Sequence, residues 1–153
     1  MRVAKVWDVT DPAGIGHVRR EAARLIDVPA PHGRRLSIGA VPTDPGGLGE
    51  LRNRVALSCS ELVTNALRHG RLPVQVQLLT DGVAWMLDVA DAATECLPEP
   101  YPHRALGQGG YGLLLVARLA SQLGWYVDDD AKHVWARLEL APDSELVDEL
   151  SAR

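Results

Sequence analysis

The sequence predicts one α+β domain, a two-layer sandwich in which helices cover one face of a mixed, mostly antiparallel sheet. Two observations lead to this prediction. Segments with alternating apolar residues come in pairs joined by short turns, as in β-hairpins. Segments with apolar residues every three or four positions stand before or between these pairs, as helices do. A chain of 153 residues fits a single domain with its own core, so we expect one domain over residues 1–153, with its central fold within residues 10–140.

The first half of the chain is predicted to contain one strand and two helices. A strand rich in Val and Trp spans residues 2–9, and a helix follows over residues 11–27. Residues 28–47 are rich in proline and glycine and are expected to form an elaborated loop. A long helix spans residues 48–69, and Gly70 is expected to end it in the left-handed conformation.

The second half is predicted to contain two hairpins separated by a loop and a helix. The four strands span residues 74–78, 83–89, 125–127 and 134–140. The first two are joined by Asp81-Gly82, a strong hairpin signal. A loop over residues 92–111 leads into a helix from Gly112 to about residue 123, which Gly124 is expected to end. Pro142 can begin a terminal helix.

Composition excludes several classes of protein. A net charge of −4 argues against a broad nucleic-acid surface, which requires clustered Lys and Arg. The N-terminus has no apolar stretch of signal-peptide length, and no apolar run approaches the roughly 20 residues that cross a bilayer. Cys59 and Cys96 stand apart from each other and from any metal-binding spacing. We therefore expect a cytoplasmic protein with no direct nucleic-acid or membrane contact.

Two polar residues of the long helix carry the first chemical signal. Glu61 and Asn65 are four residues apart and so lie on one face of the helix. Burying either group without a partner costs roughly 1–3 kcal/mol, so the pair suits a ligand site better than a core. A carboxylate can orient a hydroxyl group or a water, and an amide oxygen can bind a hard cation such as Mg²⁺. Taken alone, the pair would fit a solvent-facing helix edge equally well.

Asp91 and a glycine-rich turn supply the other parts of a candidate site. Asp91 follows its strand with the parity of the apolar residues, so its carboxylate points to the core side and requires a donor. The turn Gly107-Gln108-Gly109-Gly110-Tyr111-Gly112 offers backbone N–H groups that can bind phosphate. A carboxylate, an amide and a glycine turn in this order indicate a nucleotide site.

The glycine turn also fits other patterns. Its letters spell G-x-G-x-x-G, but a dinucleotide site needs a strand directly before the turn, and a proline-rich loop precedes this one. No Lys-Ser or Lys-Thr follows, so it is not a Walker-type loop. Residues 104–109 resemble the acetyl-CoA turn of N-acetyltransferases. An acetyl-CoA-dependent N-acetyltransferase is therefore a rival interpretation, although it gives Glu61 and Asn65 no task.

Three segments resemble the ATPase domain shared by gyrase, heat-shock chaperones and sensor histidine kinases, the histidine-kinase-like (GHKL) superfamily. Residues 61–69 match its asparagine box, residues 110–116 its second glycine box, and residues 132–138 its closing strand. The chain looks closest to the anti-sigma-factor serine kinase branch of sporulating and actinobacterial species. The resemblance covers about residues 10–140 and makes a homodimer plausible.

The resemblance implies roles for the candidate residues. Asn65 would hold the Mg²⁺ that bridges the phosphates of ATP, and Asp91 would accept a hydrogen bond from the adenine amino group. Glu61 would be the base, or the water-orienting group, for transfer to a protein serine. We add Arg68 as a cation that would offset phosphate charge. The ATP-binding backbone would come from the turn and the residues after it, namely Gly107, Gly109, Gly110, Tyr111, Gly112 and Leu113.

The implied function is an ATP-Mg-binding regulator of the anti-sigma-factor type. It would be a protein serine kinase that acts on a small anti-anti-sigma-like protein, with a sigma factor as a further partner. One segment departs from the family pattern, because Asp91 is followed by Ala92-Ala93 where glycines are usual. Alanine does not adopt positive φ cheaply, so this loop must run differently. The alternative is a catalytically weak module that binds ATP and only sequesters a partner.

Overall fold

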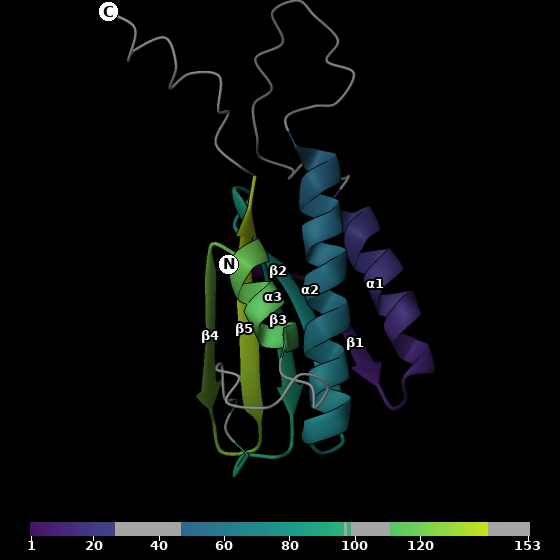
Figure 1. The fold of residues 1–153 in the computed structure, drawn as a ribbon, viewed down its shortest axis with the longest axis vertical. Helices are drawn as coiled ribbons and strands as arrows, with labels where there is room; N and C mark the ends of the chain where they lie inside the picture. The colour runs from purple at the N-terminus through teal and green to yellow at the C-terminus, as the bar shows by residue number, and fades with distance from the viewer. Residues whose placement is uncertain (27–46, 97, 99–110, 141–153) are drawn as a thin grey trace, which may run out of the picture.

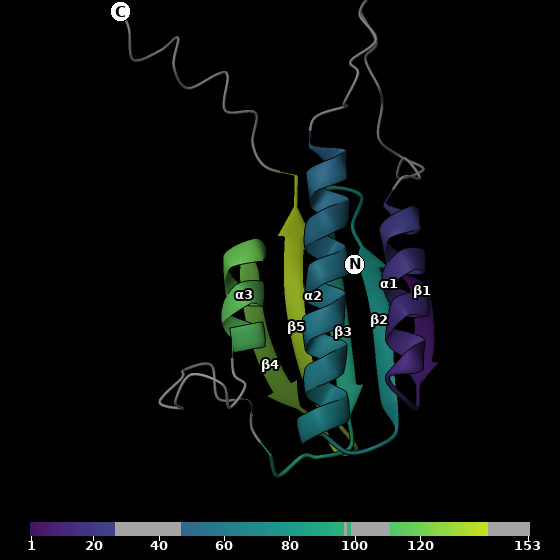
Figure 2. The ribbon, with the colours of Figure 1, turned by 45° about the vertical axis from the view of Figure 1, so that its right-hand side comes forward.

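The computed structural model describes residues 1–26, 47–96, 98 and 111–140. These residues form a two-layer α+β sandwich, in which three helices cover one face of a five-stranded sheet (Figures 1 and 2). The elements are β1 (Arg2–Val9), α1 (Ala13–Leu25), α2 (Leu48–His69), β2 (Val74–Thr80), β3 (Ala84–Asp91), α3 (Tyr111–Leu119), β4 (Gln122–Val127) and β5 (Lys132–Glu139). The predicted fold class is confirmed.

The sheet has the strand order β1-β2-β3-β5-β4, and every adjacent pair is antiparallel. The predicted hairpin at Asp81-Gly82 joins β2 to β3. There the Asp81 carboxylate accepts hydrogen bonds from the backbone amides of Val83 and Ala84, and Gly82 has a φ of 92°. Across the next pair, Asp91 at the end of β3 stands opposite Lys132 at the start of β5. This register determines what the Asp91 carboxylate contacts.

Helix α2 crosses the middle of the sheet, with α1 on the β1 side and α3 on the β4–β5 side (Figure 2). Arg54 on α2 fixes this arrangement. Its guanidinium donates to the carbonyl oxygen of Leu119 at 3.1 Å and also to that of Glu139. The end of α3 and the end of β5 are thereby attached to the same helix. The start of α3 is consequently held near the second half of α2.

The core lies between the helices and the sheet and follows the predicted spacing. On β2 and β5, buried side chains alternate with less buried ones. The fully buried large side chains are Leu51, Leu62, Leu78, Leu87, Leu138, Val9, Val55, Val63, Val74, Val76, Val89 and Val116. At about 25 cal/mol per Å² of apolar surface removed from water, such side chains supply most of the driving force for folding. Within the described ranges, no helix combines the length and apolar content that crossing a bilayer requires.

Gly70 ends α2 as predicted, but the predicted left-handed conformation is wrong. The residue does follow the last residue of α2, but its φ of −93° and ψ of −164° are extended rather than left-handed. Its lack of a side chain serves a close approach. A Cβ at this position would lie 2.5 Å from the Ala66 carbonyl oxygen and 2.6 Å from Asp91 Oδ1. Glycine is required here because the chain passes directly over the Asp91 carboxyl group.

The predicted end of the third helix is also wrong. Helix α3 ends at Leu119, and Gly124 lies inside β4 instead of stopping a helix. A Cβ at Gly124 would lie 2.5 Å from the indole of Trp135 on the neighbouring strand. The glycine therefore makes room for an aromatic ring that packs across the sheet. Almost all of the predicted loop at 28–47, part of the loop at 92–111 and the terminal helix lie outside the described residues.

Candidate functional site

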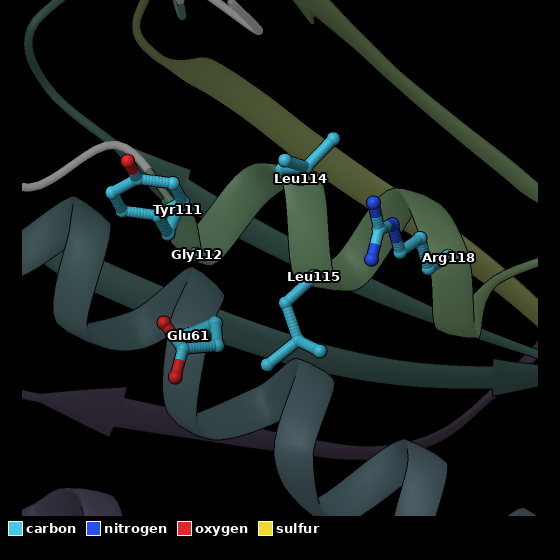
Figure 3. Close-up of a pocket in the computed structure, with 6 residues that line it drawn as sticks. All are labelled: Glu61, Tyr111, Gly112, Leu114, Leu115 and Arg118. Atoms are coloured by element: carbon cyan, nitrogen blue, oxygen red, sulfur yellow. The ribbon is translucent and has the colours of Figure 1, made fainter. Parts of the chain in front are cut away.

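The second half of α2 contacts two distant parts of the chain. Toward the middle of the helix, Glu61 lies directly beside the start of α3, where a Cβ on Gly112 would be 2.5 Å from Glu61 Oε2 (Figure 3). At the end of the helix, Gly70 packs against the Asp91 carboxyl group. At 1.5 Å per residue, these two contacts are separated by about 13 Å along the helix. The second half of α2 is therefore contacted by the last glycine of the predicted turn and, at its end, by Asp91.

Asn65 lies between these two contacts. It is four residues after Glu61 and shares its helix face, as the spacing predicts. Glu61 and Asn65 are partly exposed, and Arg68, one turn further on, is exposed. None of these three side chains has a hydrogen bond or ion pair with another described residue. No described residue therefore competes with a ligand for their polar atoms.

A shallow hollow of about 320 Å³ lies between Glu61 and α3. Its lining residues are Glu61, Tyr111, Gly112, Leu114, Leu115 and Arg118 (Figure 3). Of the predicted phosphate-binding residues, Tyr111 is exposed and Gly112 faces Glu61, whereas the side chain of Leu113 belongs to the core. The backbone amides of these three residues form the first turn of α3, where N–H groups lack helical partners. Gly107, Gly109 and Gly110 lie outside the described residues.

Asp91 occupies a different environment from Glu61 and Asn65, because it is buried and both of its oxygens have donors. It is 2% exposed. Its Oδ1 accepts the backbone amides of Ala93 at 2.9 Å and Arg71 at 3.3 Å. Its Oδ2 lies 3.1 Å from Lys132 Nζ. The prediction that this carboxylate points to the core side and finds donors is confirmed.

The donors also explain the loop after Asp91. The Ala93 amide turns back to the carboxylate, and the Ala92 amide donates to the Arg71 carbonyl oxygen at 2.8 Å. The Ala93 side chain is buried at 3% exposure. Ala92 and Ala93 both keep negative φ, since glycines supply every positive φ in the described residues. Ala92 and Ala93 therefore hold the loop against β3 and the end of α2.

Lys132 is the partner of Asp91, and sequence reasoning assigned it no role. It is 4% exposed and donates to the Cys96 carbonyl oxygen at 2.9 Å as well as pairing with Asp91. A signal existed, because Lys132 has the same parity as Val134, Ala136 and Leu138, whose side chains face the core. A lysine at such a position needs an anionic partner. The cross-strand register that supplies Asp91 as the partner is visible only in the structure.

A second polar cluster lies on the face of the sheet away from the helices. His133 follows Lys132, so its side chain points to the opposite face. Its Nδ1 lies 3.1 Å from Asp88 Oδ1, its Nε2 lies 3.2 Å from Asp128 Oδ2, and the Tyr126 ring stacks on it at 4.4 Å. Burial raises the pKa of Asp88, while His133 acts in the opposite direction. The cluster joins β3, β4 and β5 and lies apart from the candidate site.

The donor set beside α2 fits a magnesium ion carried by a nucleotide. Mg²⁺ keeps several waters and is usually held by one or two side-chain oxygens plus phosphate oxygens. Asn65 offers an amide oxygen with no partner among the described residues, and the Glu61 carboxylate stands one turn away. In the same part of the chain, no group of three or more His, Cys, Asp or Glu could form an all-protein cage. These donors suit an ion that arrives with phosphates.

Residues 33–138 match the model of the histidine kinase-like ATPase domain family. The chain belongs to this family. Membership in an ATPase family implies ATP binding and decides against the acetyltransferase interpretation. The structure is also similar to the Acinetobacter baumannii histidine kinase AdeS, at 15% sequence identity and a TM-score of 0.45, over 93% of this chain and 70% of that chain. Among curated proteins, none matches the chain.

Proposed function

We propose that this ATPase domain is an anti-sigma-type regulator that binds Mg-ATP and transfers the γ-phosphoryl group to a serine of a small partner protein. The observation that carries the proposal is the convergence on α2. Glu61 touches the start of α3, Asn65 shares its helix face, and the end of the same helix contacts Asp91. This arrangement places a carboxylate, an oxygen ligand and the first turn of α3 along the second half of α2.

The phosphate end of the site consists of Glu61, Asn65 and the first turn of α3. Backbone N–H groups at a helix start attract phosphate oxygens, because the helix dipole adds to their own partial charges. Asn65 would hold Mg²⁺ through its amide oxygen, and the ion would neutralise charge on the β- and γ-phosphates. The exposed guanidinium of Arg68 would add a further positive charge. Such transfer depends mainly on positioning and charge neutralisation.

Glu61 would act as the general base of the reaction. Its carboxylate accepts the proton of the partner's serine hydroxyl as the hydroxyl oxygen bonds to the γ-phosphorus. The bond between that phosphorus and the bridging oxygen of the β-phosphate breaks, and ADP leaves. Glu61 suits this role because it is partly exposed and has no hydrogen-bond partner among the described residues. The products are a phosphoserine and ADP.

The partner would be an anti-anti-sigma-like protein, with a sigma factor as a second partner. These partners, a possible homodimer and a cytoplasmic location stay predictions. The supporting argument is chemical: a serine hydroxyl must approach Glu61 from solvent, and the hollow beside Glu61 is open and shallow. A small folded protein can present a serine on a loop to such a surface, since loops carry reactive residues.

The test compares Glu61→Ala with the wild-type protein. We expect Mg-ATP binding, measured by calorimetry, to change by less than about threefold, because the carboxylate is not assigned to binding. Formation of phosphoserine on a candidate anti-anti-sigma-like protein, followed with labelled ATP, should fall about 10²–10⁴-fold, the usual contribution of a positioned base. Asn53→Ala, at an exposed position of the same helix, is the control. Unchanged transfer in the Glu61 variant would refute the assignment of the base.

A second candidate function is a module that sequesters its partner without phosphorylating it. One observation favours it, namely that Asp91 is buried and already bonded through both oxygens. Such a protein would bind the partner equally well with and without Mg-ATP and would leave no phosphoserine. Measuring both partner binding and serine phosphorylation in the same preparation distinguishes the two functions.

A further inference from the structure

Lys132 is the residue that pairs with the Asp91 carboxylate. It is the first residue of β5 and lies directly opposite Asp91, the last residue of β3. Its side chain is 5% exposed, and that of Asp91 is 2% exposed. Lysine is almost never buried to this degree without an anionic partner. The ion pair with the Asp91 carboxylate therefore holds the ammonium group in this buried position.

The contacts around the pair leave little capacity for another group. Lys132 Nζ lies 3.1 Å from Asp91 Oδ2 and donates to the Cys96 carbonyl oxygen at 2.9 Å. The other carboxylate oxygen, Oδ1, already accepts two backbone amides, those of Arg71 and Ala93. Gly70 covers the carboxyl group so closely that a Cβ would collide with it. Among the described residues, Oδ2 has the Lys132 ammonium group as its donor, whereas Oδ1 has two.

A nucleotide base that binds Asp91 must meet this ammonium group. An exocyclic amino group is a donor, as is the lysine, so both require the same carboxylate oxygen. The two donors would also be crowded, because the pair is enclosed by the loop after Asp91 and by the end of α2. The buried charge pair is broken only at a cost, since both ions lose a partner in a site remote from water.

We propose that Lys132 is an affinity-determining residue that competes internally with the nucleotide base for Asp91. This inference rests on the proposed function, because it assumes that Asp91 receives the base. The base binds only when the ammonium group withdraws from Oδ2, and the free energy of breaking this ion pair is subtracted from binding. Affinity for ATP is thus lower than the Asp91 carboxylate alone would give.

The first test replaces Lys132 by threonine, which is favoured in strands and is too short to donate a hydrogen bond from the position of the lysine Nζ. Lys132→Thr should bind Mg-ATP roughly 10–100-fold more tightly than the wild-type protein in calorimetry, which corresponds to the loss of one competing charge-assisted hydrogen bond. Lys5→Thr, an exposed position on β1, removes the same charge without touching Asp91 and should leave the affinity unchanged. Equal or weaker binding by the Lys132 variant would overturn the proposal.

The second test needs no variant and therefore does not depend on the folding of one. Amine acetylation of the native wild-type protein is followed by mass spectrometry, with and without saturating Mg-ATP. We expect Lys132 to react slowly alone and severalfold faster with Mg-ATP, because withdrawal exposes the amine, while Lys5 reacts equally in both. If the ion pair stayed intact in the presence of Mg-ATP, the acetylation rate of Lys132 would not change. Unchanged or slower labelling of Lys132 therefore refutes the competition.

The outcomes separate this inference from the proposed function. If the wild-type protein binds Mg-ATP and Lys132→Thr binds it no better, the competition fails and the proposed function stands. If neither protein binds Mg-ATP at millimolar concentration while both retain the circular dichroism of the folded state, the nucleotide assignment itself fails. If the variant gains affinity and Lys132 becomes more reactive with Mg-ATP, both are supported.

Discussion

The two ends of the proposed nucleotide site differ in how far the protein satisfies its own polar groups. At the phosphate end, Glu61 and Asn65 are partly exposed and have no partners among the described residues. At the base end, defined by Asp91 and Lys132, both side chains are buried and each makes at least two polar contacts. The polar groups at the phosphate end therefore remain able to bind a ligand, whereas those at the base end stabilise the fold.

Because of this difference, mutations at one end should affect ligand binding and mutations at the other should affect stability. A polar group with no partner contributes little to stability, so its removal affects ligand binding. A buried charge pair with hydrogen bonds has the opposite property, since removing one member leaves the other without compensation. Substitutions at the phosphate end should change binding or transfer, and substitutions at the base end should first change stability.

The largest expected effect is on stability at the base end. Asp91→Ala leaves the Lys132 ammonium group buried without its partner, which costs about 3–5 kcal/mol. We expect the free energy of unfolding, measured by urea denaturation, to fall by about this amount. Asp129→Ala, in an exposed turn, is the control and should stay within about 0.5 kcal/mol of the wild-type value. A loss at Asp91 no larger than at the control would remove the distinction between the two ends.

The next effect is on binding at the phosphate end. Asn65→Ala removes the proposed magnesium ligand and should lower Mg-ATP affinity at least about 100-fold, or about 2.7 kcal/mol, in calorimetry. The free energy of unfolding should change by less than about 0.5 kcal/mol, because the amide has no partner among the described residues. Asn53→Ala, exposed on the same helix, should change neither quantity. Full ATP affinity in the Asn65 variant would show that the metal assignment is wrong.

Two glycine-to-alanine substitutions test the difference between the two ends of the site, because the added methyl group meets fixed atoms at one end and a flexible side chain at the other. In Gly70→Ala the Cβ meets the Ala66 carbonyl oxygen and the fixed Asp91 carboxylate, so we expect a loss of about 1–3 kcal/mol in unfolding free energy. In Gly112→Ala it meets the end of the Glu61 side chain, which can move. Stability should then change by less than about 0.5 kcal/mol, while phosphotransfer falls.

The control for this pair is Gly16→Ala in α1. There the Cβ approaches only the terminal nitrogen of Arg20 at 3.3 Å, a flexible group. Alanine is the better helix former by about 1 kcal/mol, so this variant should be as stable as the wild-type protein or more stable. If Gly70→Ala behaved like Gly16→Ala in denaturation, the close approach to Asp91 would not be a constraint.

The smallest effect is a difference in cysteine reactivity. Burial raises the pKa of the Cys59 thiol to about 12, so almost no thiolate forms at pH 8, whereas the thiol of Cys96 is exposed at the rim of the base end. Iodoacetamide at pH 8 should modify Cys96 and spare Cys59 in the folded protein, as counted by mass spectrometry. Modification of both at equal rates would mean that the core side of α2 opens readily.

Much of the fold and the phosphate end could be predicted from the sequence. Alternation in β2 and β3 gave the hairpin and placed Asp91 on the core side, because the side-chain period of a strand is two. The four-residue spacing of Glu61 and Asn65 placed them on one helix face for the same kind of reason. These features depend on local periodicity, which a sequence displays directly.

The base end could not be predicted in the same way, because it depends on which residues meet across strands. The pairing of Asp91 with Lys132 follows from the register of β3 and β5, and the need for Gly70 follows from how the chain leaves α2. The end of α3 could not be predicted either, because apolar residues near position 120 fit a helix or a strand equally well. The ring of Trp135 over Gly124 resolves that ambiguity only in three dimensions.

Under the proposed function, the Asp91 carboxylate couples thermal stability to ligand affinity. One group fastens the chain after α2, the loop after β3 and the start of β5 through the amides of Arg71 and Ala93 and the amine of Lys132. The same group is the proposed acceptor for a base. A substitution that frees it for the ligand also loosens these three segments, so selection for a more heat-resistant protein would act against selection for tighter nucleotide binding at this residue.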